Sequence, residues 1–313
     1  MRILVVGAGA VGGYFGARLA AAGRDVTFLV REHRAAQLRA IGLQVKSPCG
    51  DATIAPADLK LISAQELAAS KSAFDLIFLG TKAYALDAAI NDFAPAVGAN
   101  TAILPILNGM RHLDMLSARF GVEHVLGGAS RIVADLDPEG RVIHIEQWQD
   151  LVFGELDKRI TPRIEEIAKA LHGDGFDDQL SPDIVAFMWQ KWMLLSSMAG
   201  LTCLLRGNIG EIARAPFGVE TERAFLKETA AIATASGYPP TDKSFNSVSV
   251  RLTDPKSELT ASMYRDLQKN SAVEADHILG DLLRRGNSLG LKSPLLQAAY
   301  VALSVYGMRK PVQ

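Results

Sequence analysis

The chain opens with MRILVVGAGAVGGYFG, residues 1–16, and this stretch decides the fold. Its apolar run Ile3–Val6 is typical of a buried parallel strand. The chain then turns at Gly7 and enters a stretch of helical pattern that we expect Gly23 to close. A second apolar strand is expected over Asp25–Val30, so the beginning of the chain predicts a β-α-β unit.

Three glycines in the first turn, Gly7, Gly9 and Gly12, have the G-x-G-x-x-G spacing of a dinucleotide-binding loop. The first permits the tight turn, the second lets the backbone approach a pyrophosphate, and the third lets the helix pack closely on the strand. Free N–H groups at the helix start would face the phosphates. A glycine-rich turn without a ligand is the alternative, but the flanking strand and helix favour the dinucleotide site. The residues expected to bind the cofactor are Gly7, Ala8, Gly9, Ala10, Val11 and Gly12.

The end of the second strand indicates which dinucleotide is bound. An acidic residue at this point usually holds the ribose 2′-hydroxyl of NAD, whereas an arginine accommodates the 2′-phosphate of NADP. Arg31 occupies the position, and Arg34 follows closely. We therefore expect NADP. Two alternatives stay open: Glu32 could serve the hydroxyl, or Arg31 could be an ordinary solvated charge.

Composition excludes several classes of protein. Hydrophobic residues make up 49% of the 313 residues and charged residues 21%, as in a globular protein with a buried core. The formal net charge is −1 and no basic run is present, so a nucleic-acid surface is not expected. The two cysteines, Cys49 and Cys203, suggest neither a disulfide framework nor a metal site. We expect a cytoplasmic protein without a targeting segment, a membrane span or a bound metal.

Polar residues follow two further apolar strands. Asp75–Leu79 runs into Thr81 and Lys82, and Thr101–Leu107 runs into Asn108. In an open α/β sheet, ligands lie outside the carboxyl ends of the strands, so these residues are candidates for a cofactor or substrate site. An ordinary turn at Asn108 is the alternative.

The pattern changes near residue 180. Residues 124–156 predict antiparallel strands over Val125–Ala134, Val142–Ile145 and Leu151–Gly154. Beyond them the helical period dominates, with helices expected over Asp183–Leu205, Phe217–Ser236, Thr241–Leu252, Glu258–Asn270, Val273–Leu289 and Pro294–Tyr306. We therefore expect two domains, an α/β domain over residues 1–180 and an all-α domain over residues 181–313.

The helix over Asp183–Leu205 contains the most informative charged residue. Lys191 lies four residues from Phe187 and four from Leu195, and thus on an apolar face. Such a lysine either extends to the edge of the face, pairs with an acid, or lies partly desolvated in a cleft, where a lowered pKa suits a general acid. The residues themselves leave these three alternatives open.

Ser262 and Glu274 stand out only in combination with the rest of the chain. Ser262 is an ordinary residue for a helix start, and Ser271 to Glu274 has the spacing of a capping box. Together the motifs resemble the ketopantoate reductase (2-dehydropantoate 2-reductase) family over essentially the whole chain. Those motifs are the glycine loop, Val30-Arg31, Thr81-Lys82-Ala83, Asn108-Gly109-Met110, Gly140-x-Val142-x-His144, Trp189-x-Lys191, Gly210-Glu211, Ser262-Met263 and Glu274-x-Asp276.

The resemblance implies a fold and an activity. The fold would be an α/β N-terminal Rossmann domain followed by an all-α C-terminal domain like that of 6-phosphogluconate dehydrogenase, with a cleft between them. The activity would be NADPH-dependent reduction of a 2-keto acid to a 2-hydroxy acid, first of all 2-dehydropantoate to pantoate in pantothenate biosynthesis. Hydride addition builds negative charge on the keto oxygen, which a lysine ammonium can stabilise and protonate.

The resemblance also implies roles for single residues. Lys191 would be the general acid, and Asn108 would contact cofactor and substrate. Glu274 would hold the cofactor ribose and the substrate hydroxyl, so the catalytic set is Lys191, Asn108 and Glu274. Ser262 would bind the substrate carboxylate beside Lys191. Arg31 and Lys82 would face the adenosine phosphates or ribose.

Three positions depart from the family pattern. Where family members carry asparagines one and two turns after the lysine, this chain has Leu195 and Ala199. Where they carry asparagine before Gly-Glu, it has Ile209, with Asn208 one position early. Since the missing amides help to bind the substrate, these departures favour a more apolar 2-keto acid.

The sequence is also compatible with other functions. A β-hydroxyacid or opine-type dehydrogenase shares the domain layout and a helical lysine, and a non-catalytic NADP-sensing protein would fit the missing amides. We expect a small-molecule substrate and neither a nucleic-acid nor a membrane partner. A homodimer formed through the helical domain stays an open alternative.

Overall fold

The computed structural model describes residues 1–70, 72–173 and 175–309 of the chain. The chain divides into two compact units. The first consists of Met1–Leu107 and His112–Val185, and the second of Asn108–Arg111 and the chain from Ala186 onward. Residues 310–313, the end of the expected domain 181–313, lie outside the described residues.

A five-stranded parallel sheet forms one layer of the first unit. Its strands lie in the order β5 (Lys60–Ile62), β2 (Asp25–Leu29), β1 (Arg2–Val6), β6 (Leu76–Leu79) and β7 (Ala102–Pro105). β1 pairs with β2 on one side and with β6 on the other, and β6 pairs with β7. The expected strand runs Asp25–Val30, Asp75–Leu79 and Thr101–Leu107 are confirmed, each somewhat shorter than expected. Their side chains are buried on both faces, which explains the continuous apolar runs.

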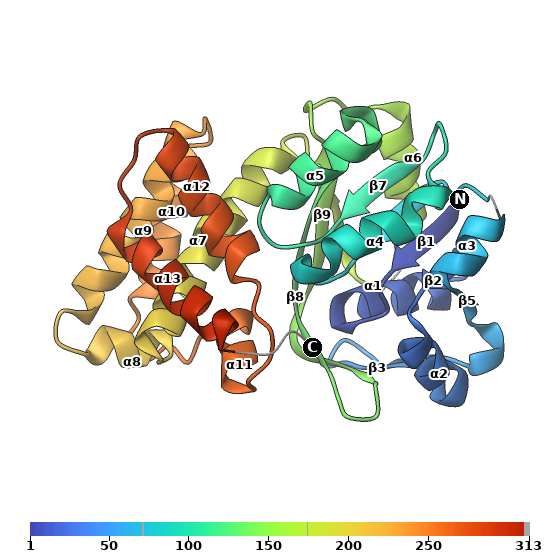
Figure 1. Cartoon of the computed structure of the whole chain (residues 1–313), viewed down its shortest axis with the longest axis horizontal. Coiled ribbons are helices and arrows are strands. Elements are labelled where there is room, and N and C mark those ends of the chain that lie inside the picture. Colours follow the sequence, from blue (N-terminus) through green and yellow to red (C-terminus); the bar gives the residue numbers. More distant parts are fainter. Residues whose placement is uncertain (71, 174, 310–313) are drawn as a thin grey trace. The chain divides into compact units, whose positions relative to one another are not determined.

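Helices alternate with these strands, as the colour sequence from blue to green in Figure 1 shows. They are α1 (Ala10–Ala21), α2 (Glu32–Ile41), α3 (Ala64–Ser70), α4 (Leu86–Phe93), α5 (Arg111–Phe120) and α6 (Pro162–Leu171). Local signals set their starts. Ser63 and Glu66 form a capping box at α3, in which each side chain bonds the other residue's backbone N–H. Thr161 caps α6, with proline at the first helical position.

A second sheet of the first unit covers the other side of α1. Its strands lie in the order β10 (Asp177–Leu180), β9 (Val142–Glu155), β3 (Leu43–Lys46) and β4 (Ala52–Ile54), and β8 (Leu126–Leu136) also pairs with β9. The antiparallel hairpin of β8 and β9 is confirmed. The prediction of separate strands Val142–Ile145 and Leu151–Gly154 is wrong, because both belong to β9. This long strand also pairs with β3 and β10 in parallel.

Glycines bring α1 close to both sheets. A Cβ at Gly16 would come within 2.4 Å of the Phe28 ring on β2, and one at Gly13 would come within 3.1 Å of Val142 on β9. Between these contacts, Tyr14 and Phe15 are fully buried. The helix that follows the glycine loop is therefore the centre of this unit's core.

Helices make up the second unit, drawn from yellow to red in Figure 1. They are α7 (Ile184–Leu205, from Ala186 onward), α8 (Ile209–Arg214), α9 (Gly218–Ala235), α10 (Asp242–Leu252), α11 (Ser262–Gln268), a π-helical turn (Asp276–Gly280), α12 (Asp281–Ser288) and α13 (Pro294–Met308). Trp192 of α7 is buried and donates its indole N–H to the Ile278 carbonyl. Within the described chain, no helix combines the length and apolar character that crossing a membrane requires.

Two of the expected helices are shorter than predicted. The helix expected from Glu258 begins only at Ser262, because the carbonyls of Ser257 and Leu259 accept bonds from the backbone at the start of α8. The helix expected over Val273–Leu289 begins as a π-helical turn and continues as α12. Helical periodicity in the sequence does not reveal either change.

Candidate active site

The carboxyl ends of the parallel strands lie side by side in the first unit. Val6 is in register with Leu29 on one side and with Leu79 on the other, and Leu79 is in register with Pro105. The glycine loop, Arg31 and Lys82 follow three of these aligned ends. The sheet therefore brings these predicted cofactor residues to one edge, where ligands of such sheets are bound.

The glycine loop has the geometry of a phosphate cradle. Gly7 has φ +90°, which favours glycine, and a Cβ at Gly12 would lie 2.1 Å from the Gly7 carbonyl oxygen. A Cβ at Gly9, in contrast, would meet no atom within 4 Å, so the space beside this residue is open. α1 starts at Ala10 without a side-chain cap, which leaves its first N–H groups for a ligand.

The loop after β6 completes this edge. A Cβ at Gly80 would lie 2.8 Å from the Gly12 Cα, so the two backbones approach each other as closely as glycine permits. The hydroxyl of Thr81 is buried and has no hydrogen-bond partner among the described residues. An unpartnered buried hydroxyl is uncommon and marks a place where a ligand can supply the bond. These features fit a dinucleotide.

Arg31 and Glu32 lie differently. Arg31, just after β2, is exposed, and its guanidinium makes no hydrogen bond or ion pair with any residue that the structure describes. The Glu32 carboxylate instead accepts a bond at 2.9 Å from Nη1 of Arg39, which lies about two turns further along α2. The free cation at the strand end is therefore Arg31, which fits an anionic group better than a ribose hydroxyl.

In the second unit, the Asn108–Arg111 segment packs on the π-helical turn. A Cβ at Gly109 would lie 3.0 Å from the His277 carbonyl oxygen, so only glycine fits there. Arg111 Nη1 donates to an Asp276 carboxylate oxygen at 2.5 Å. Asn108 is half-buried and belongs to the same unit. Asn108 thus lies on a segment that packs against the turn that follows Glu274.

Asp276 joins several elements of the second unit. It accepts bonds from Arg111 of α5, from Arg284 Nη1 of α12 at 2.7 Å and from the Tyr300 hydroxyl of α13 at 2.7 Å. The hydrogen bonds from Arg284, followed by that from Tyr300 and the positive charges nearby, lower the pKa of Asp276 to about 2 against the effect of burial. Asp276 therefore stays a carboxylate and keeps its partners at any ordinary pH.

The other predicted catalytic residues have these positions. Lys191 is half-buried on α7, and Leu195, one turn later on the same face, is half-buried as well. Ser262 is the exposed first residue of α11. Glu274 is half-buried and precedes the helix that starts at Ala275, where no side-chain cap bond forms. The capping-box alternative for Glu274 is therefore wrong.

The departures from the family pattern have mixed surroundings. Ala199 and Ile209 are buried, with exposed fractions of 3% and 0%, whereas Leu195 is half-buried. Nearby polar groups are engaged elsewhere. Ser196 donates to a carbonyl of its own helix, Ser197 bonds Thr229, and Asn208 caps α8 in a capping box.

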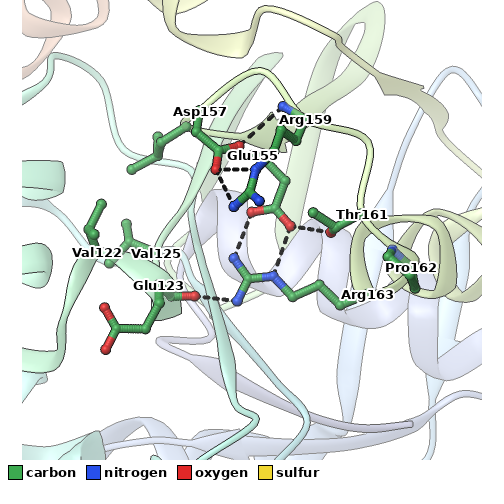
Figure 2. A pocket seen from close by; sticks show the side chains of 10 residues that line it. Val122, Glu123, Val125, Glu155, Asp157, Arg159, Thr161, Pro162 and Arg163 are labelled. Carbon is green, nitrogen blue, oxygen red and sulfur yellow. Dashed lines mark hydrogen bonds and ion pairs between the residues drawn. The ribbon is translucent and has the colours of Figure 1, made fainter.

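A pocket of about 490 Å³ in the first unit contains none of these residues. Figure 2 shows its polar lining, in which Arg163 faces the Glu155 carboxylate and Arg159 faces Asp157. Arg163 forms two bonds to Glu155, at 2.8 and 2.6 Å, and Thr161 donates a third. Both arginines that line this pocket are paired with acids, so the pocket offers no free positive charge.

Sequence reasoning missed the Asp276 network and the membership of Asn108–Arg111 in the second unit. The Glu274-x-Asp276 spacing was the available signal, but its partners come from three other elements. In the described parts of the chain, no group of three or more His, Cys, Asp or Glu side chains is placed to hold a metal ion.

Comparisons with known proteins agree with this arrangement. A family model described as ketopantoate reductase PanE/ApbA matches residues 3–158, and its C-terminal counterpart matches residues 183–307. The uncharacterized oxidoreductase YkpB of Bacillus subtilis is 35% identical over 311 residues, which cover 99% of this chain and all of the relative.

Solved structures show the same fold. The 2-dehydropantoate 2-reductase of Geobacter metallireducens is 28% identical, with a TM-score of 0.86 over 97% of this chain and 99% of its own. D-mandelate dehydrogenase, solved with NADH and anilino(oxo)acetate, is 24% identical with a TM-score of 0.85 over 98% of each chain, a likeness of fold alone. With both family models matched across its two units, the chain belongs to the ketopantoate reductase family of oxidoreductases.

Proposed function

We propose that this protein reduces a 2-keto acid to the 2-hydroxy acid with NADPH, and that 2-dehydropantoate is the first substrate to test. The observation that carries the proposal is the presence, in one chain of this family, of the glycine cradle and of Lys191 half-buried on an apolar helix. A cradle alone would fit a sensor. A lysine on an apolar helix of the same chain favours an enzyme.

Each catalytic residue has one task in the proposed reaction. The reduced nicotinamide, when bound, supplies a hydride to the keto carbon. Lys191 stabilises the charge that develops on the keto oxygen and donates the proton. Asn108 and Glu274 orient the reacting groups, and Ser262 holds the substrate carboxylate.

Arg31 supports the choice of NADPH. It is exposed at the end of the second strand, and its guanidinium has no partner among the described residues, while the nearby Glu32 is paired with Arg39. A free guanidinium binds a phosphate dianion better than a hydroxyl. We also propose a cytoplasmic location, with which the two free cysteines are consistent.

Leu195 favours a second candidate substrate, a branched 2-keto acid without the distal hydroxyl, such as 2-ketoisovalerate. Leu195 lies on the Lys191 face of α7, where the family pattern has an amide. Ser196, Ser197 and Asn208 do not replace that amide, because each already serves another group. A substrate hydroxyl buried without a partner costs about 1–3 kcal/mol.

Steady-state kinetics with both keto acids test the proposal. NADPH consumption is followed with 2-dehydropantoate and with 2-ketoisovalerate over the same concentration range. We expect turnover of both, with kcat/KM for 2-ketoisovalerate at least comparable to that for 2-dehydropantoate. A hundredfold preference for 2-dehydropantoate would refute the apolar-substrate candidate, and oxidation of 3-hydroxy acids without any 2-keto acid reduction would refute the proposal itself.

A further inference from the structure

Arg34 of α2 joins three separate segments of the first unit. Its Nε donates to the Ala8 carbonyl of the glycine loop at 2.8 Å, and its Nη1 donates to the Gly140 carbonyl in the β8–β9 turn at 2.7 Å. Nη1 also reaches the Gln37 side-chain oxygen at 3.1 Å. The guanidinium therefore ties the loop that cradles a dinucleotide to a turn more than a hundred residues away.

The guanidinium of Arg34 forms no ion pair with any residue that the structure describes. All three acceptors are neutral oxygens, and Nη2 is buried without a hydrogen-bond partner among the described residues. The nearest acid that acts on it, Asp137, is already paired with Arg141 at 2.5 Å. Burial accordingly lowers the pKa of Arg34, although a guanidinium remains charged. Buried charges are normally paired, so an unpaired one indicates a missing anion.

The bond to Ala8 has a geometric consequence. The peptide that joins Ala8 to Gly9 is trans, so its C=O and N–H point in opposite directions. With the carbonyl turned toward Arg34, the Gly9 N–H is turned away from it. This N–H donates to no described group, and the space beside Gly9 is open.

We infer that Arg34 is a positioning residue for the dinucleotide pyrophosphate: it holds the Ala8 peptide so that the Gly9 N–H faces the phosphate. Its unpaired charge lies behind the loop and favours the same anion. The inference rests on the proposed dinucleotide site and adds a second task to the arginines near β2. Arg31 would select the 2′-phosphate, while Arg34 would serve the pyrophosphate that NADH and NADPH share.

Two fragments of the cofactor separate these tasks. ADP-ribose contains the pyrophosphate but no 2′-phosphate, and 2′-AMP contains the 2′-phosphate but no pyrophosphate. Binding of both fragments, and of NADH and NADPH, is measured by calorimetry or by NMR titration on the whole protein. Binding stoichiometry separates a loss of affinity from a loss of folded protein.

The expected results form a crossed pattern. Arg34→Gln should weaken ADP-ribose, NADH and NADPH by about tenfold each and leave 2′-AMP unchanged. Arg31→Ala should weaken 2′-AMP and NADPH and leave ADP-ribose unchanged. Arg39→Gln is the matched control, since Arg39 lies on the same helix in an exposed pair with Glu32 and should alter no affinity.

A substitution at Gly140 disturbs the Arg34 guanidinium while Arg34 itself stays unchanged. Gly140 has φ +84°, and a Cβ there would lie 2.7 Å from Arg34 Nη1. Gly140→Ala should therefore weaken ADP-ribose in the same direction as Arg34→Gln, and it decides the question if Arg34→Gln does not fold. If the unmodified protein binds ADP-ribose and the folded variants bind it with the same affinity, the proposed role of Arg34 is refuted. The proposed function is not affected by that result. If the unmodified protein binds neither ADP-ribose nor NADPH, the proposed function fails together with the role of Arg34.

Discussion

Two segments that follow parallel strands, the glycine loop after β1 and Asn108–Arg111 after β7, are each tied by an arginine, but in opposite ways. Arg34 holds the glycine loop through the neutral Ala8 carbonyl, and its half-buried guanidinium forms no ion pair with a described residue. The charge of Arg111 is neutralised by an ion pair with the Asp276 carboxylate. The first arrangement retains charge for an anionic ligand, whereas the second satisfies its charge internally and orients a loop.

This difference predicts a division of labour. Changes around the strand ends of the first unit should alter cofactor affinity and leave turnover at saturation unaffected. Changes at Lys191 and in the Asp276 network of the second unit should alter turnover more than cofactor affinity. The predictions below test that division, beginning with the largest expected effect.

Lys191→Ala tests the second unit most strongly. Loss of the proposed proton donor should lower kcat by roughly 10²–10⁴-fold, the usual scale for general acid catalysis. NADPH affinity should change little, because the lysine serves the keto oxygen. Lys227→Ala, at an exposed lysine of α9, is the control and should retain full turnover. Retained turnover in Lys191→Ala would assign the residue to the edge of an apolar face, with no catalytic role.

Arg31→Ala tests the first unit. Removal of the free guanidinium should weaken NADPH by about tenfold to a hundredfold, the value of one charged contact to the 2′-phosphate. NADH affinity and kcat at saturating cofactor should stay the same. Titration of both cofactors by fluorescence measures the effect. Equal affinity of the unmodified protein for NADH and NADPH would contradict the role of Arg31.

Asp276→Asn tests whether the hydrogen bonds of Asp276 keep Asn108 in position. An amide cannot hold Arg111, Arg284 and Tyr300 as the carboxylate does, so Asn108 should lose its fixed position. Because small misplacements of catalytic groups are costly, we expect kcat to fall about tenfold, with a smaller loss of NADPH affinity because Asn108 is also a proposed cofactor contact. Tyr300→Phe removes one bond of the network and should have a smaller effect. A selective loss of NADPH affinity in Asp276→Asn would contradict the division between the units.

Glu222 provides a counterpart to Arg34 in the second unit. Its carboxylate is fully buried on α9 and has no hydrogen-bond partner within the described ranges. Burial raises its pKa from 4.5 to about 7. Where Arg34 stays charged, Glu222 becomes neutral by binding a proton.

The pH dependence of stability follows from this shift. The unfolded chain releases the Glu222 proton near pH 4.5, while the folded protein keeps it to about pH 7. Stability should therefore decrease between these two values, by about 1–3 kcal/mol, and level off above them. Denaturant unfolding from pH 4 to 8 measures it, and Glu222→Gln should remove this component. An identical pH profile for Glu222→Gln would show that another group is responsible.

The parts of the fold that sequence reasoning predicted depend on local signals. Glycine spacing and continuous apolar runs place the loop of Gly7 and the strand ends correctly, and Ser63 with Glu66 marks the start of α3. Neither signal reports contacts between distant segments. Two of the three bonds of Arg34 span 26 and 106 residues, and the bond of Arg111 to Asp276 spans 165.

The candidate site was predicted unevenly for the same reason. The residues of the glycine loop could be named from physics alone, because each glycine has a steric task in the turn. Lys191, Ser262 and Glu274 needed the family resemblance, since a lysine on an apolar helix or a serine at a helix start has ordinary alternatives. The π-helical turn at Asp276 changes which residues face one another and leaves no mark in the periodicity.

The close contact between Gly12 and Gly80 limits which mutations the two codons can accept. A Cβ at Gly12 would meet the Gly7 carbonyl oxygen, and a Cβ at Gly80 would meet the Gly12 Cα. Every missense change of a glycine codon introduces a Cβ, so neither position has a neutral first step to another amino acid. In a saturation library selected for activity, these two codons should accumulate synonymous changes alone.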